Sequence, residues 1–76
     1  MVSEIVEGGL YMSPSGKPFK VLHRASHAQD CSLSMVVFTN LIPTDRPEGT
    51  IWVLSESLFV KLYTGPLEEI NHGFKT

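Results

Sequence analysis

The sequence is poor in several residue types, and each shortage argues against a class of protein. A single cysteine, Cys31, rules out an intramolecular disulfide and a cysteine-based zinc cluster. Only 6 Lys and Arg residues, against 8 Asp and Glu, give a net charge of −2, which disfavours non-specific coating of DNA or RNA. No apolar run approaches the ~20 residues of a membrane-spanning helix. The acidic N-terminus lacks a signal-peptide pattern, so we expect a cytoplasmic protein that does not enter a membrane.

The motifs of common enzymes are missing as well. The chain has neither a G-x-S-x-G turn nor a glycine-rich phosphate loop. Cys31 lies near His27, but their spacing within one loop does not make a catalytic dyad. The available metal donors show no recognisable ligand spacing; they are His23, His27, Asp30, Cys31 and His72. We therefore predict no catalytic residues, no metal site and no cofactor.

The length of the chain sets a limit on its stability. Its 76 residues predict a single domain, 1–76, with a core over 9–63 and a tail over 64–76. A domain of this size buries only about 60% of the surface that its unfolded chain exposes. Without a disulfide or a metal, it needs a compact apolar core, which a second subunit would extend.

Turn-forming residues divide the chain into short segments that favour β-structure. Glycine and proline cluster at 8–9, 14–18, 43–49 and 65–66. The segments between them have the length of strands and are too short for ordinary helices: 9–12, 19–25, 34–40, 50–55 and 59–63. The sequence therefore predicts an all-β fold with five antiparallel strands.

The connections refine this prediction. Ser55 is a good cap, so residues 55–58 predict one 3₁₀ turn before the last strand, as in small SH3-like barrels. In the tail, Pro66 suits the first position of a helix, Glu68 and Glu69 suit its first turn, and Gly73 suits its end. We expect a five-stranded SH3-like barrel followed by a short C-terminal helix.

The order and spacing of several short motifs carry a resemblance to a known family. The matching residues, spread over about 9–63, are Gly9, Tyr11, Gly16, Phe19, Val21, Leu22, Ala25, His27, Val36, Val37, Phe38, Leu41, Trp52, Val53 and Phe59. In this pattern the chain resembles the DUF1653 family of short bacterial proteins, a domain of unknown function. The resemblance implies a small β-barrel and no established activity. The chain departs from the family's usual sequence at 28–30 and 54–55.

His27 and Asp30 lie three residues apart in the polar loop 26–33. In one interpretation they form an acid/base pair or contact a ligand. In the other, Asp30 bonds to backbone amides of its own loop and His27 is half-exposed or packs against the strand. The loop composition favours the second interpretation.

Alternation along the strands indicates which faces are apolar. In the second segment, Phe19, Val21 and Ala25 share one face, while Lys20, Leu22 and Arg24 share the other. The third and fourth segments are apolar on both faces, because Met35 and Val37 oppose Val36 and Phe38, and Ile51 and Val53 oppose Trp52 and Leu54. The second face is then covered by the tail, a partner subunit or a ligand, unless strong bending of a small barrel buries parts of both faces.

These patterns lead to three hypotheses about function. The first is an SH3-like binding module for a protein or peptide, without catalysis, whose ligand-binding residues are Tyr11, Arg24, His27, Asp30, Trp52 and Tyr63. The second is a single-stranded nucleic-acid contact through Lys20, Arg24 and aromatic side chains. The third is a structural homodimer that joins through one apolar face of the third and fourth strands. In one version of this hypothesis, the protein comes from a mobile element.

Overall fold

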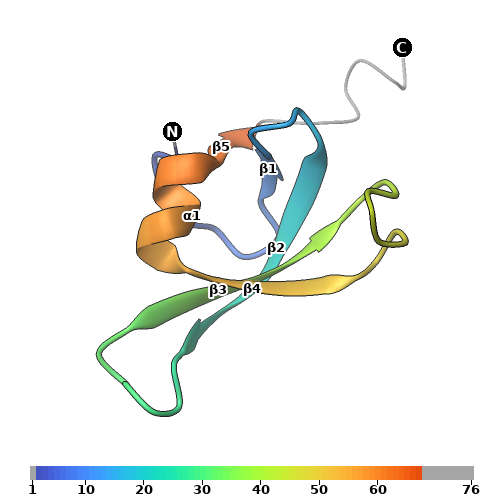
Figure 1. Ribbon diagram of the computed structural model, residues 1–76. Helices are drawn as coiled ribbons and strands as arrows, with labels where there is room; N and C mark the ends of the chain where they lie inside the picture. The colour runs from blue at the N-terminus through green and yellow to red at the C-terminus, as the bar shows by residue number, and fades with distance from the viewer. Residues whose placement is uncertain (1, 68–76) are drawn as a thin grey trace.

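The computed structural model describes residues 2–67 and has the mainly-β architecture that the sequence predicts (Figure 1). The elements, in chain order, are β1 (Leu10–Met12), β2 (Pro18–Ser26), β3 (Ser34–Asn40), β4 (Ile51–Ser55), α1 (Glu56–Leu62) and β5 (Thr64–Leu67). The strands form one five-stranded sheet in the order β4-β3-β2-β1-β5, and every neighbouring pair is antiparallel. Within residues 2–67, no helix is long and apolar enough to cross a membrane.

The sheet is open. Strands β1 to β4 follow one another as a meander, and the chain then passes through α1 and returns to pair β5 with β1. Strands β4 and β5 are therefore the two edges, and no pairing between them closes the sheet in the described part of the chain. The expected barrel closure is thus not observed, whereas the five antiparallel strands are confirmed.

The prediction of a strand over residues 59–63 is wrong, as is the 3₁₀ turn over 55–58. These residues form α1 and its caps. The Ser55 hydroxyl accepts a hydrogen bond from the backbone N–H of Leu58 at 3.4 Å, which caps the helix N-terminus. Phe59 and Tyr63 are four residues apart, so a helical backbone brings both rings to the same side of the chain.

Strand β5 occupies the position where the sequence predicts the start of a C-terminal helix. Pro66 is tolerated there because an edge strand does not need every backbone N–H for the ladder. Gly65 has a φ of +146°, and a Cβ at this position would lie 2.7 Å from the Tyr11 ring, so only glycine fits. The remaining residues of the predicted helix, 68–76, lie outside the described residues.

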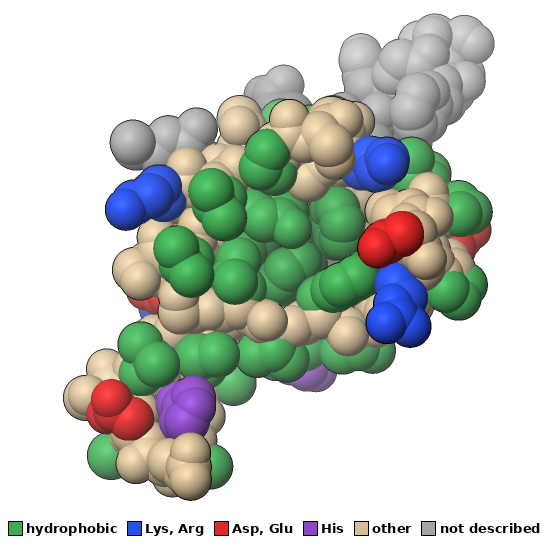
Figure 2. Space-filling model, in the orientation of Figure 1, with side chains coloured by type: hydrophobic (Ala, Val, Ile, Leu, Met, Phe, Trp, Pro, Cys, Tyr) green, Lys and Arg blue, Asp and Glu red, His purple; other side chains and the backbone are tan. Residues whose placement is uncertain are grey.

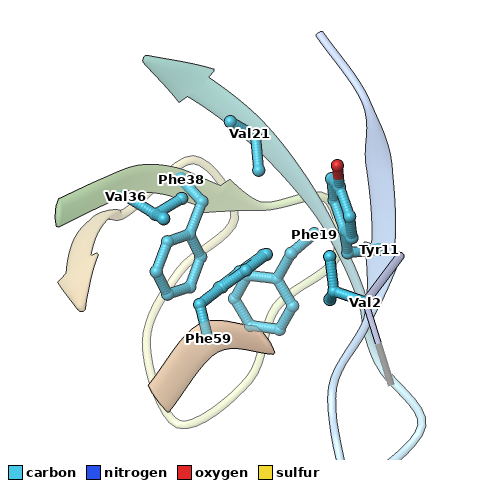
Figure 3. Close-up of a cluster of buried hydrophobic side chains, with 7 residues drawn as sticks. All are labelled: Val2, Tyr11, Phe19, Val21, Val36, Phe38 and Phe59. Carbon is cyan, nitrogen blue, oxygen red and sulfur yellow. The ribbon is translucent and has the colours of Figure 1, made fainter. Parts of the chain in front are cut away.

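The core lies between α1 and one face of the sheet (Figure 3). It consists of Val2, Tyr11, Phe19, Val21, Val36, Phe38 and Phe59. Phe59 is fully buried, and its ring centroid is 5.1 Å from that of Tyr11 and 5.2 Å from that of Phe38. Since burying a side chain of this size stabilises the fold by about 1.5–3 kcal/mol, Phe59 attaches the helix to the sheet.

A β-bulge in β2 changes which residues share a face. The pairing with β3 shifts register between Val21 and His23. Beyond this bulge Arg24 is paired with the buried Val36, so Arg24 and not Ala25 lies on the core face. The expectation that Phe19, Val21 and Ala25 share one face is therefore wrong. Lys20 lies before the bulge, next to the inward-facing Phe19, so Lys20 and Arg24 are on opposite faces of the sheet.

The pairing register of β3 and β4 shows which of their two apolar faces belongs to the core and which is exposed. Val36 is paired with Leu54 and Phe38 with Trp52, and these four side chains lie on the core face. Val37 is paired with Val53, and Thr39 with Ile51, on the opposite face. There Ile51 is 59% exposed and Val53 is 58% exposed. Trp52 therefore does not belong to the exposed apolar face.

Candidate functional site

A groove with a volume of about 390 Å³ opens between the β1–β2 turn and the loop that joins β3 to β4. Figure 2 shows hydrophobic side chains in a hollow on this face, with charged side chains at its rim. The residues that line the groove are Ser13, Pro14, Ser15, Lys17, Phe19, Thr44, Asp45, Trp52 and Tyr63. They come from five separate segments, so the folded chain alone assembles this site.

Aromatic side chains form the apolar part of the groove. The rings of Phe19 and Tyr63 meet edge to face at a centroid distance of 5.6 Å. Tyr63 also stacks on the buried Phe59, with a distance of 4.6 Å between the ring centroids. The backbone N–H of Tyr63 donates to the Phe59 carbonyl at 2.9 Å. Tyr63 is therefore fixed by both its ring and its backbone, which favours a rigid binding surface.

Asn40 holds the opposite wall in place. This side chain is only 1% exposed, at the end of β3. Its Nδ2 group donates to the carbonyls of Ile42 at 2.8 Å and Pro47 at 3.0 Å. Its Oδ1 atom accepts from Nε1 of Trp52 at 3.1 Å. One buried amide thus couples the β3–β4 loop to the indole ring that lines the groove.

The β1–β2 turn forms the other wall. The backbone N–H of Ser13 donates to the Lys17 carbonyl at 2.8 Å, and that of Lys17 donates to the Ser13 hydroxyl at 3.0 Å. Gly16 has a φ of +84°, a conformation that glycine adopts without strain. These contacts hold Pro14 and Ser15 in place at the mouth of the groove.

The two walls carry charges of opposite sign. Lys17 lies on the turn and Asp45 on the facing loop, and neither forms an ion pair with another described residue. Burial raises the pKa of Tyr63 above its usual value of 10.0, so its hydroxyl stays protonated at neutral pH. The groove therefore offers aromatic surface, a neutral hydroxyl, one cation and one anion.

Of the aromatic residues that the sequence predicts at a ligand site, Trp52 and Tyr63 lie together in this groove. Tyr11 does not, because its ring is fully buried in the core. The Tyr11 hydroxyl accepts from the backbone N–H of Val6 and donates to the Glu4 carbonyl, each at 2.9 Å. Its assignment as a ligand contact is wrong, since it anchors the N-terminal segment to the sheet.

The other predicted site residues lie away from the groove. Arg24 forms an ion pair with Glu56 at 2.7 Å, which ties β2 to the first turn of α1. The Nδ1 atom of His27 accepts from the backbone N–H groups of Gln29 and Asp30, at 3.1 and 3.2 Å. Asp30 accepts from the backbone and side chain of Ser32. The two side chains thus organise their own loop, as in the structural interpretation of this pair.

Sequence reasoning missed the rest of the site region, including the charged residues Lys17 and Asp45 and the two residues Phe19 and Asn40. Phe19 is assigned to a strand face but not to a ligand surface. Asn40 follows Val36 and Phe38 at alternate positions, so the strand period alone places it on the core face, where a buried amide needs partners. That signal could have identified Asn40. In the described part of the chain, no three metal-ligating side chains come together.

Comparison with known proteins finds no match: no family model, no curated protein and no solved structure is significantly similar to this chain. The resemblance to the DUF1653 family therefore stays a prediction.

Proposed function

We propose that this protein is a non-enzymatic binding module that holds an extended peptide segment of a partner protein in the groove. The observation that carries the proposal is the fixed aromatic surface of Phe19, Trp52 and Tyr63 between two walls of opposite charge. Aromatic-lined grooves suit extended, proline-containing segments, because such segments present apolar proline rings and lose little entropy on binding. As part of this proposal, the open sheet is a variant of an SH3-like barrel in a cytoplasmic protein.

The hydrogen-bonding groups of the groove residues further restrict the class of ligand. The Nε1 group of Trp52 already donates to Asn40, so the indole offers a peptide mainly its ring surface. The protonated Tyr63 hydroxyl and the Lys17 ammonium are donors, which match the free carbonyls of an extended segment. Asp45 suits a basic side chain on the same segment. The favoured ligand is an extended, proline-containing segment that carries charges of both signs.

The nucleic-acid alternative finds less support. It needs Lys20 and Arg24 on one surface beside exposed aromatic rings. The β-bulge separates these two cations onto opposite faces, and Arg24 is already paired with Glu56. Neither Lys20 nor Arg24 lines the aromatic groove.

The test is a titration monitored by fluorescence of Trp52, the single tryptophan of the chain. The probes are an uncharged proline peptide, two proline peptides with Arg and Glu at opposite ends in either order, and a short oligothymidine. We expect one of the charged peptides to bind more tightly than the uncharged one. Asp45→Lys should weaken that binding about 2- to 5-fold, as for an exposed ion pair.

Glu48→Lys is the matched control, because it makes the same charge change in the same loop outside the groove lining. It should leave peptide affinity unchanged. The proposal fails if no peptide perturbs Trp52, or if only oligothymidine binds and does so in a salt-sensitive way.

A further inference from the structure

In the part of the chain that the structure describes, strand β4 is an unprotected edge. Among residues 2–67 its only strand partner is β3, so its outer side leaves alternate backbone N–H and C=O groups without a strand partner (Figure 1). Edge strands are usually protected by lysine, proline, a bulge or an inward-pointing charge. The β4 sequence, IWVLS, contains no charged residue and no proline, and its register with β3 is unbroken.

The opposite edge strand, β5, is protected from pairing with another strand, unlike β4. Val2 forms a β-bridge with Gly65, and the backbone N–H of Ser3 donates to the Gly65 carbonyl at 2.9 Å. Pro66 also lacks the N–H that a further strand would need. One sheet edge is therefore covered by the chain's own N-terminal segment, and the other is left able to pair.

We propose that β4 pairs antiparallel with β4 of a second copy of this chain, with Val53 on the two-fold axis. In this register Val53 is opposite Val53 of the partner subunit, and Ile51 is opposite Ser55 of the partner subunit. On the other face, Trp52 is opposite Leu54 of the partner subunit. The five-residue strand is self-complementary, since no pairing brings like charges together.

Two observations favour a second copy as the occupant of this edge. Ile51 and Val53 are 59% and 58% exposed, and a neighbouring strand would cover part of both side chains. Because β5 is blocked, the assembly ends at two subunits and does not continue into a fibre. A junction of one short strand is small beside the 5007 Å² surface of the chain. It falls below the ~800 Å² per partner of a standard interface, so the dimer is reversible and concentration-dependent.

The first test is the mass of the protein over a wide concentration range, by sedimentation equilibrium. The wild type should shift from monomer to dimer as its concentration rises. Val53→Lys places two like charges on the two-fold axis and should stay monomeric. Leu62→Lys is the matched control, because it adds the same charge at a 46% exposed apolar position on α1 and should still dimerise.

The second test determines the register of the β4–β4 pairing by disulfide crosslinking, in a Cys31→Ser background under mild oxidation. Val53→Cys should form a disulfide-linked dimer readily, because the two thiols face each other across the axis. Ile51→Cys should not, since the two thiols are offset by four residues, about 13 Å.

Two results would overturn the proposal. One is a wild type that remains monomeric up to about 1 mM, where even a weak dimer would be populated. The other is disulfide formation by Val37→Cys as efficient as by Val53→Cys. Val37 lies on the inner strand β3, so that result would indicate two sheets packed face to face.

Discussion

Replacing Asn40 by alanine tests whether one buried amide organises the groove. The substitution removes two donated hydrogen bonds, to Ile42 and Pro47, and one that is accepted from Trp52. The alanine side chain is too short to replace any of them. The Ile42 carbonyl and the indole N–H then lose their partner in a region where Asn40 itself is 1% exposed, whereas the Pro47 carbonyl keeps the hydrogen bonds from Thr50.

The expected cost follows from these contacts. Each hydrogen bond contributes about 0.5–1.5 kcal/mol net, and a polar group left unpaired in the interior costs about 1–3 kcal/mol. Part of the loop can reach water, so we expect a total loss of about 2–4 kcal/mol in the free energy of unfolding. For a domain of this length, that corresponds to a fall in Tm of about 10–25 °C.

The assay is urea denaturation followed by Trp52 fluorescence, which also reports on the native state. In Asn40→Ala the indole loses its hydrogen bond and gains access to water, so emission of the folded protein should shift to the red. Thr44→Ala is the control in the same loop, because its hydroxyl makes only exposed contacts with Asp45 and Arg46. It should cost less than about 1 kcal/mol.

A second substitution at the same position separates the amide donors from side-chain size. Asn40→Asp keeps the shape and an acceptor for Trp52, but it places a carboxylate against the carbonyls of Ile42 and Pro47. It should destabilise the fold at neutral pH at least as much as alanine does. If Asn40→Ala costs less than about 1 kcal/mol and leaves the emission unchanged, Asn40 does not organise the groove.

Three further predictions concern other parts of the fold. Tyr11→Phe leaves the Val6 amide without its acceptor and should cost about 1–2 kcal/mol in urea denaturation, whereas an unchanged midpoint would show that the hydroxyl contributes nothing. The double change His27→Ala and Asp30→Ala should barely alter the Tm, and a fall of more than about 8 °C would contradict this. Burial raises the Tyr63 pKa above 10.0, so its contribution to stability should be constant below about pH 10 and be lost as the pH rises through the folded-state pKa. Ultraviolet absorbance of tyrosinate, compared with Tyr63→Phe, checks this.

Most of the strand assignment could be predicted from local sequence. Glycine and proline mark the turns, and the segments between them give β1 to β4 within one or two residues. The region 59–63 could not be predicted in this way, because FVKLY fits both a strand and a short helix. The Ser55 cap and the burial of Phe59 against Phe38 decide in favour of the helix.

The groove could be predicted only in part. Trp52 and Tyr63 are expected at a binding surface because they are aromatic, but the same reasoning selects Tyr11, which is buried. Nothing local distinguishes the three rings. What separates them is the β5 strand and the N-terminal segment, which cover Tyr11 and leave the other two in the groove.

The sequence by itself determined the class of the fold, through turn residues and the two-residue period of its strands. It also determined that β3 and β4 are apolar on both faces, because that property depends only on the order of residues along each strand. Only the tertiary structure decided which face became the core and which edge stayed open. Those choices depend on where α1 and the N-terminal segment pack. Such contacts join residues far apart in the chain, and their energies are not encoded in any single segment.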